Sequence, residues 1–150
     1  MSASALFAAC MAMTAQMFDL PPRLLPAIQA TEGGWVGAVR RNPNGSEDLG
    51  LMQVNTVWLP RLARASGLPP EELRERLIYD GCFSIQVAGA ILRMNLNAER
   101  GNLMRAIGNY HSRTPGRNEA YQERVVNSAI RLFGYGTAGR GGENQRSGGQ

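Results

Sequence analysis

One acidic residue stands where a carboxyl group could act as a proton donor. Glu32 follows an apolar segment with helical spacing and precedes Gly33-Gly34, so it is predicted to end a helix. The carboxyl end of a helix carries partial negative charge, which disfavours a carboxylate and raises its pKa. A carboxyl group that stays protonated near neutral pH can protonate a leaving oxygen, as the cleavage of a glycosidic bond requires. Glu32 is therefore a candidate general acid, and the alternative is an ordinary solvated glutamate at a helix end.

A second carboxylate, Asp48, follows the turn-forming residues Asn44-Gly45 and lies on the second arm of a predicted hairpin. A hydrolase that retains configuration needs such a group about 5 Å from the acid as a nucleophile, whereas in a transglycosylase the C6 hydroxyl of the substrate can attack instead. Two interpretations are open. Asp48 either stabilises the developing cation or acts as the nucleophile, or it caps the hairpin by accepting hydrogen bonds from backbone amides.

Three separated segments resemble those of the lysozyme-like lytic transglycosylases, specifically the small specialised members associated with type III and type IV secretion, pilus and conjugation systems. They are the helix that ends at Glu32, the block Gly50-Leu51-Met52-Gln53, and Ala106-Ile107-Gly108-Asn109-Tyr110. The resemblance covers roughly residues 10 to 133, because it also includes Cys10, Asp80-Gly81-Cys82 and the helix through Gly89 to Leu92. The segment around Asp48 also resembles the one that carries the second carboxylate of c-type lysozymes.

The resemblance implies a reaction and a set of roles. Glu32 would protonate the oxygen between N-acetylmuramic acid and N-acetylglucosamine and then, as a carboxylate, remove the proton of the C6 hydroxyl. The product would be a 1,6-anhydromuramoyl end, and no cofactor is required. Gln53 would bind the N-acetyl group of the sugar, and Tyr110 would hold Glu32 or the sugar. The other candidates for substrate binding are Gly50, Met52 and Asn55, although capping of the following helix is the preferred role of Asn55.

The chain departs from the family at two positions. Gly33 follows the glutamate where the family usually has serine, and His111 follows Tyr110 where it usually has asparagine. The missing hydroxyl bears on rate and substrate preference more than on the class of reaction. A lone histidine is more often structural than catalytic, and no metal-ligand cluster accompanies this one. His111 is therefore left out of the catalytic set, and no metal is expected.

Two other functions are open. A lysozyme-type hydrolase would use Glu32 and Asp48 to cleave the same bond with water. A non-catalytic module would bind peptidoglycan without cleaving it, and Gly33 slightly favours that interpretation. The net charge of +4 suits an anionic polymer, and all the basic residues other than the one histidine are arginine. A nucleic-acid partner is not expected, because no aromatic-basic binding motif is present.

The elements that must position these residues are mainly helical. Apolar spacing predicts helices over residues 4–18, 22–32, 56–66, 70–77, 82–98, 102–110 and 118–133, and a small β-hairpin is predicted between residues 35 and 55. The expected fold is α+β, predominantly helical and, by the resemblance, lysozyme-like, with the hairpin beside the catalytic helix. Residues 1–133 form the predicted domain, and the glycine-rich residues 134–150 a flexible tail. Three aromatic residues could either stack on sugars or lie in the core: Trp35, Trp58 and Tyr121. For Trp58 the core is the preferred location.

The two cysteines, Cys10 and Cys82, are too far apart for a CxxC motif and could be two thiols or one disulfide. A cell-wall substrate implies the periplasm, where a disulfide persists, so the resemblance favours the bridge. No run of about 20 apolar residues is present, so no transmembrane segment is expected. The N-terminal residues are interpreted as the first helix, and no export signal is evident. The expected protein is a monomer acting on peptidoglycan strands, with a secretion, pilus or conjugation complex as candidate partner.

Overall fold

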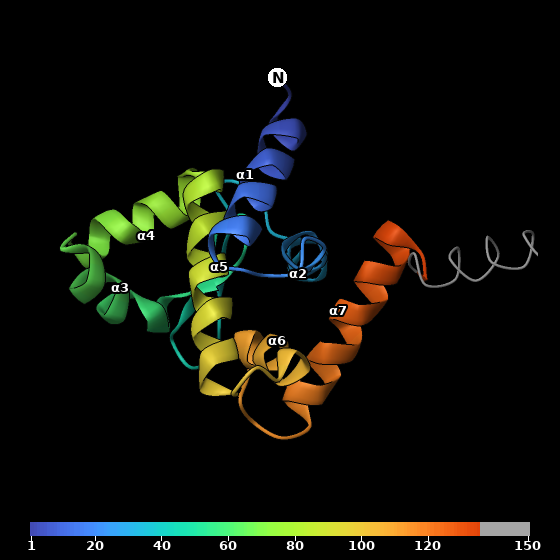
Figure 1. The fold of residues 1–150 in the computed structure, drawn as a ribbon. Coiled ribbons are helices and arrows are strands. Elements are labelled where there is room, and N and C mark those ends of the chain that lie inside the picture. Colours follow the sequence, from blue (N-terminus) through green and yellow to red (C-terminus); the bar gives the residue numbers. More distant parts are fainter. Residues whose placement is uncertain (136–150) are drawn as a thin grey trace, which may run out of the picture.

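The computed structural model describes residues 1–135 of the chain (Figure 1). The prediction of a mainly helical α+β chain is confirmed for these residues. In chain order the elements are α1 (Ala3–Met17), α2 (Leu24–Glu32), β1 (Val39–Arg41), β2 (Glu47–Leu49), β3 (Val54–Asn55), the 3₁₀-helix η1 (Thr56–Trp58), α3 (Leu59–Ser66), α4 (Pro70–Tyr79), α5 (Gly81–Ala98), α6 (Leu103–His111) and α7 (Arg117–Phe133). The predicted domain ends where α7 ends, and residues 136–150 of the predicted tail lie outside the described residues.

Helix α5 is the central element of the fold (Figure 1). It packs against α1, α4 and α6, while α7 packs against α6 and α2. Apolar residues recur along α5 at helical spacing and are fully or almost fully buried, among them Ile85, Ala88, Ile91 and Leu92. Gly89 lies on the face toward α1, where a Cβ atom would collide with Thr14. The glycine therefore lets the two helices approach closely.

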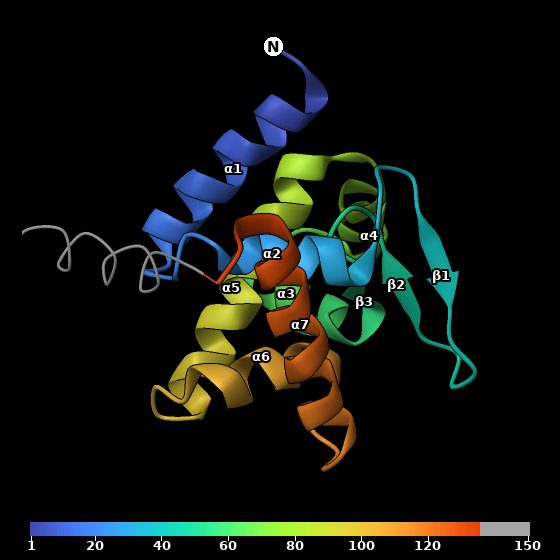
Figure 2. The same ribbon diagram turned by 90° about the vertical axis from the view of Figure 1, so that its right-hand side faces the viewer.

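The predicted hairpin is present and is extended by a third strand. The sheet is antiparallel with the order β1-β2-β3, and Asp48 of β2 pairs with Asn55 of β3. The turn between β1 and β2 contains Gly45 at a φ of 86°, which an Asn-Gly turn requires. Figure 2 shows β1 and β2 at one side of the molecule, beyond the carboxyl end of α2. Strand β3 was not predicted, because two residues are too few to show an alternating pattern.

The predicted helix over residues 56–66 is divided in two. The first turn is η1, and α3 begins at Leu59 with a proline in its first turn, where a missing N–H costs nothing. The Oδ1 atom of Asn55 accepts a hydrogen bond from the backbone N–H of Val57 at 2.9 Å. The preferred role of Asn55 as the cap of the following helix is therefore confirmed.

The predicted disulfide is confirmed. Cys10 of α1 is bonded to Cys82 in the first turn of α5, with the two Cα atoms 5.6 Å apart. That separation is typical of disulfide bonds. The bridge ties the N-terminal helix to the central one.

Within residues 1–135, no single helix has the length and apolar composition needed to cross a membrane. Helices α4 and α5 meet both requirements only as a pair, across a bend of 112°.

Candidate active site

Glu32 is the last residue of α2, as predicted. The helix ends there because Gly33 adopts the left-handed conformation at a φ of 64°, and its N–H donates to the carbonyl of Gln29 at 2.8 Å. The next residue, Gly34, is buried, and a Cβ atom on it would collide with the carbonyl oxygens of Gly50 and Leu51. This close approach fixes the carboxyl end of α2 against the loop that follows β2. Glu32 is thereby placed beside the sheet.

The loop Gly50–Gln53 forms the support behind the site. Gly50 has a φ of 68° and faces the carbonyl of Leu77 so closely that no Cβ atom fits. The side chain of Met52 is fully buried, and its carbonyl oxygen accepts a hydrogen bond of 2.7 Å from the hydroxyl of Tyr110. Neither Gly50 nor Met52 lines the cleft described next. Their position indicates that they shape the loop.

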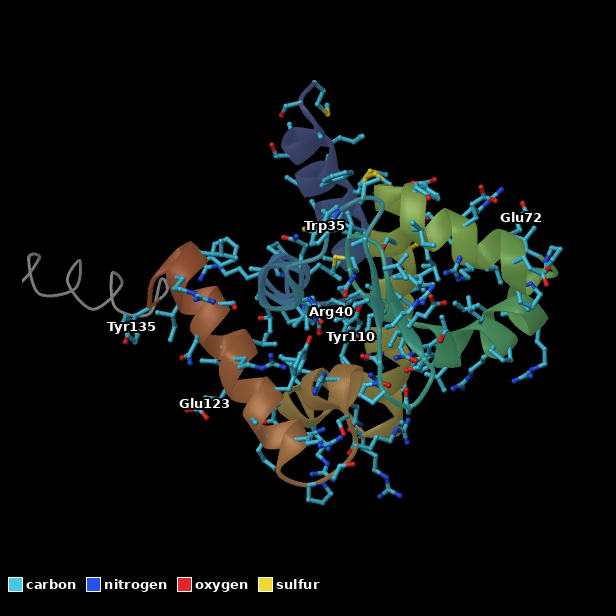
Figure 3. The ribbon with its side chains drawn as sticks, turned by 180° about the vertical axis from the view of Figure 1, so that it is seen from behind. Trp35, Arg40, Glu72, Tyr110, Glu123 and Tyr135 are labelled. Carbon is cyan, nitrogen blue, oxygen red and sulfur yellow. A yellow bond between two sulfur atoms is a disulfide. The ribbon has the colours of Figure 1, made fainter. Side chains whose placement is uncertain are left out.

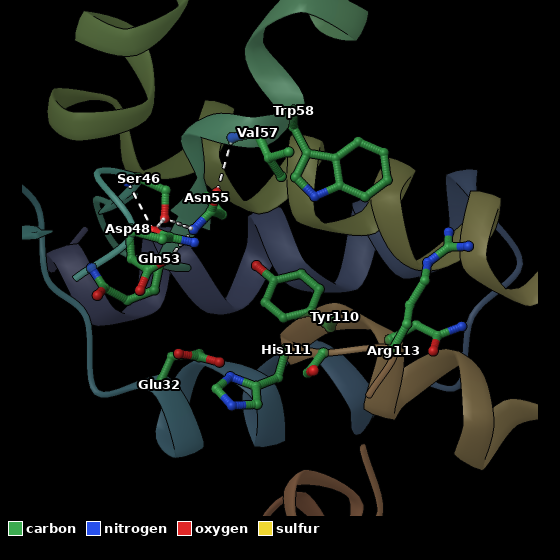
Figure 4. Close-up of a pocket in the computed structure, with 13 residues that line it drawn as sticks. Glu32, Ser46, Asp48, Gln53, Asn55, Val57, Trp58, Tyr110, His111 and Arg113 are labelled. Carbon is green, nitrogen blue, oxygen red and sulfur yellow. Dashed lines mark hydrogen bonds between the residues drawn. The ribbon is translucent and has the colours of Figure 1, made fainter. Parts of the chain in front are cut away.

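A cleft of about 380 Å³ opens in front of this loop (Figure 4). It brings together five of the seven residues predicted for catalysis or substrate binding: Glu32, Asp48, Gln53, Asn55 and Tyr110. A second hollow of about 470 Å³ adjoins it and shares six lining residues with it: Asn44, Ser46, Asp48, Asn55, His111 and Ser112. The two hollows are the halves of one groove. Asp48 and His111 lie where the two halves meet. A groove of this kind suits an extended polymer.

Asp48 is held in the groove by side-chain amides. Its Oδ2 accepts from Nδ2 of Asn42 at 3.2 Å, and its Oδ1 accepts from Nδ2 of Asn55 at 3.0 Å. The backbone amides of the hairpin, the expected donors if Asp48 were a turn cap, do not bond to it among the described residues. Each carboxylate oxygen therefore has a fixed direction and keeps a lone pair for the groove.

The electrostatics of Glu32 suit a general acid. Burial of this half-buried side chain is the main cause that raises the pKa of its carboxyl group, and the negative charge of Asp48 raises it further. The nearby hydroxyl of Tyr121 and the charges of Arg124 and Arg40 act in the opposite direction. The net shift is upward, as predicted from the helix end, although burial is the principal cause.

Tyr121 was not predicted as part of the site beyond a role in stacking or in the core. It lies on the inner face of α7 and is fully buried. Its hydroxyl forms no hydrogen bond of normal length among the described residues, but it lies close enough to Glu32 to hold the pKa of that carboxyl group down. Burial raises the pKa values of both Tyr110 and Tyr121 well above the ordinary range, so both hydroxyls remain protonated donors.

The remaining aromatic residues lie in different surroundings. Trp58 packs against the core with part of its surface and lines the cleft with the rest. The predicted core location therefore describes only part of its surroundings. Trp35 is 64% exposed and does not line the cleft. In Figure 3 Trp35 lies next to α1, and Tyr110 lies farther from that helix. Trp58 is therefore the tryptophan that can meet a substrate in the cleft.

Comparisons with known proteins agree with this geometry. The family model described as "Transglycosylase SLT domain" matches residues 9–132. Invasion protein IagB of Salmonella typhimurium (strain SL1344) is 30% identical over 127 residues, which are 84% of this chain and 76% of the relative. Protein IpgF of Shigella flexneri is 30% identical over 125 residues, 83% of this chain and 78% of the relative. The family match also confirms the lysozyme-like fold that the resemblance implied. The chain therefore belongs to the transglycosylase SLT domain family.

Proposed function

We propose that this protein is a peptidoglycan lytic transglycosylase that cleaves the β-1,4 bond between N-acetylmuramic acid and N-acetylglucosamine and leaves 1,6-anhydromuramoyl ends. The observation that carries the proposal is the half-buried Glu32, whose carboxyl pKa is raised mainly by burial and which lines the same groove as Asp48. Membership of the family supports the class of reaction. The chemical end left on the released muropeptides tests the proposal.

In the first step, the Glu32 carboxyl group donates its proton to the glycosidic oxygen, and the bond from that oxygen to C1 of the muramoyl residue breaks. Positive charge develops on the sugar ring, where the Asp48 carboxylate stabilises it. In the second step, the C6 hydroxyl attacks C1, and the Glu32 carboxylate takes the hydroxyl proton. Glu32 is regenerated in its acid form, so no cofactor and no covalent intermediate are needed.

Gln53 is the proposed contact to the N-acetyl group. Gln53 is buried, and its backbone has a φ of 54°. Its Nε2 donates a hydrogen bond to the carbonyl of Gly50 at 3.0 Å. Its Oε1 is buried without a hydrogen-bond partner among the described residues. A buried acceptor of this kind is satisfied when a donor arrives, and the N–H of an acetamido group supplies one. Asn55 is proposed to act indirectly, because its side-chain amide donates a hydrogen bond to Asp48.

Asp48→Asn is expected to lower kcat/KM about 10²-fold, because the variant loses the charge that stabilises the cation. The products should still carry anhydromuramoyl ends. The acid form of Glu32 is the active one, so activity falls as pH rises through its pKa. Loss of the Asp48 charge lowers that pKa, and the alkaline limb of the pH profile should move to lower pH. An unchanged alkaline limb would show that the two carboxylates do not interact.

Tyr121→Phe is expected to move the alkaline limb in the opposite direction, to higher pH. The hydroxyl stabilises the charged form of Glu32, so its removal raises the pKa of that carboxyl group. The rate on the plateau should change less than the position of the limb, because the hydroxyl acts through the pKa of Glu32 and not on the substrate. The thermal unfolding midpoint serves as the control and should change little, because this hydroxyl makes no hydrogen bond of normal length. A limb that stays in place would remove Tyr121 from the site.

A hydrolase is the second candidate, because Glu32 and Asp48 lie on the same groove as the two carboxylates of a lysozyme mechanism would. The observation that favours the transglycosylase is that both oxygens of Asp48 are already held by amides of Asn42 and Asn55. An acceptor fixed in this way suits a stabilising charge better than a nucleophile.

The proposal includes the periplasm as the place of action and a secretion, pilus or conjugation system as the machine served. One relative being named an invasion protein supports the second point.

A further inference from the structure

His111 occupies a central position in the groove. It is the last residue of α6, and it lines both halves of the groove, as Asp48 does. Its ring is stacked on that of Tyr121, with 5.0 Å between the centroids and an interplanar angle of 10°. Glu32 lines the first half of the groove together with this imidazole (Figure 4). A glycan strand that passes from one half of the groove to the other must pass this ring.

The imidazole is held by stacking, and its two ring nitrogens have no hydrogen-bond partner among the described residues. The stack on Tyr121 restricts the orientation of the ring. The backbone behind it is also fixed. Asn118 of α7 donates from Nδ2 to the carbonyl of Ser112 at 3.0 Å and to Oδ1 of Asn109 at 2.9 Å. A fixed ring with one donor and one acceptor free is suited to bind a polar ligand.

The charges around His111 favour its neutral form. Burial is the first cause that lowers its pKa, Arg124 and Arg117 of α7 lower it as well, and Asp48 of β2 raises it. Of the other titratable groups, Tyr121 of α7 stacks on the ring, and Glu32 of α2 lines the same half of the groove. The ring therefore offers both an N–H donor and a nitrogen acceptor at neutral pH.

We propose that His111 is a substrate-contacting residue, whose imidazole hydrogen-bonds the amino sugar that lies where the two halves of the groove meet, beside the bond that Glu32 cleaves. The inference rests on the proposed function and assigns a residue that the sequence left out of the site. The ligand is a β-1,4-linked chain of N-acetylated sugars, which presents hydroxyl and acetamido groups to the ring. Protonation of the ring removes the acceptor and adds a third positive charge beside the two arginines.

The test compares His111→Phe with His111→Gln in the cleavage of purified peptidoglycan. Phenylalanine keeps the stack on Tyr121 but has no polar atom, and kcat/KM should fall about tenfold. Glutamine restores a donor and an acceptor and should recover most of that loss. Glu123→Gln serves as the matched control. Glu123 lies on α7, the helix that carries Tyr121, but its side chain points outward (Figure 3). Equal activity of the Phe variant and the wild type overturns the proposal.

The pH profile supplies a readout that a structural role would not change. Charging of His111 should limit the wild type at acidic pH, so the acidic limb should move to lower pH in His111→Gln. The alkaline limb belongs to Glu32 and should stay close to its original position. An acidic limb that does not move contradicts the proposal, because it shows that the ring does not act in its neutral form.

A binding measurement separates failure of this inference from failure of the proposed function. Calorimetry with chitotetraose would compare Glu32→Gln with the double variant Glu32→Gln/His111→Phe, neither of which needs to cleave. A tenfold weaker affinity of the double variant supports the contact even if the wild type does not cleave peptidoglycan. Equal affinities overturn the contact even if the wild type yields anhydromuramoyl ends.

Discussion

Glu32→Gln is expected to reduce the release of muropeptides from peptidoglycan by about 10²- to 10⁴-fold, the usual contribution of a general acid or base. The loss should lie toward the upper end of this range, because one carboxyl group serves both steps of the proposed mechanism. Glutamine has the same shape but can neither donate a proton to the glycosidic oxygen nor accept one from the C6 hydroxyl. The initial rate of soluble muropeptide formation measures the effect.

The fold of the Glu32→Gln variant provides the control. Burial raises the pKa of Glu32, so the folded state binds more protons than the unfolded state, and stability falls as pH rises through that interval. Glutamine removes this penalty, and the thermal unfolding midpoint at neutral pH should stay unchanged or rise. Glu123→Gln, on the outward face of α7, should retain full activity (Figure 3). Retention of more than a tenth of wild-type activity by Glu32→Gln would exclude Glu32 as the acid.

Removal of the disulfide should produce the largest loss of stability. The bridge closes a loop with a sequence separation of 72, and in the chain-entropy model a loop of that length contributes about 4 kcal/mol to the free energy of unfolding. Cys10→Ser/Cys82→Ser should therefore unfold at a clearly lower temperature. Chemical denaturation of the wild type and of the double variant measures the difference.

A reducing agent provides a second route to the same state. It should lower the stability of the wild type to that of the double variant and leave the double variant unchanged. Similar denaturation midpoints for the wild type with and without the reductant would show that the bridge contributes little. Cleavage of peptidoglycan at a temperature where both proteins are folded should be similar, because neither cysteine lines the groove.

Local chemistry explains why some features could be predicted from the sequence. The end of α2 depends on Gly33, whose left-handed backbone stops the helix directly after Glu32. The first hairpin depends on Asn44 and Gly45, which form its turn. These features need only a few neighbouring residues, so their pattern is visible in the chain. The pairing of Cys10 with Cys82 came from the resemblance to a family and not from spacing.

Contacts between distant elements could not be predicted. The pairing of β2 with β3 and the division of the helix at residue 59 depend on tertiary packing. Gly50 and Met52 belong to a recognised block, but the block does not reveal which residues line the groove and which support it. His111 stacks on Tyr121 because α6 and α7 pack closely, as they do at Gly108, where a Cβ atom would collide with Asn118. Only the inward spacing of Tyr121 with Val125 and Ser128 on α7 gave a sign of its burial.

The most direct test of the proposed function is mass spectrometry of the muropeptides that the purified wild-type protein releases from peptidoglycan, with Glu32→Gln measured alongside. The mechanism predicts 1,6-anhydromuramoyl ends in the wild-type products and their disappearance in the variant. Reducing muramoyl ends released by the wild type would contradict the transglycosylase mechanism and make the protein a hydrolase.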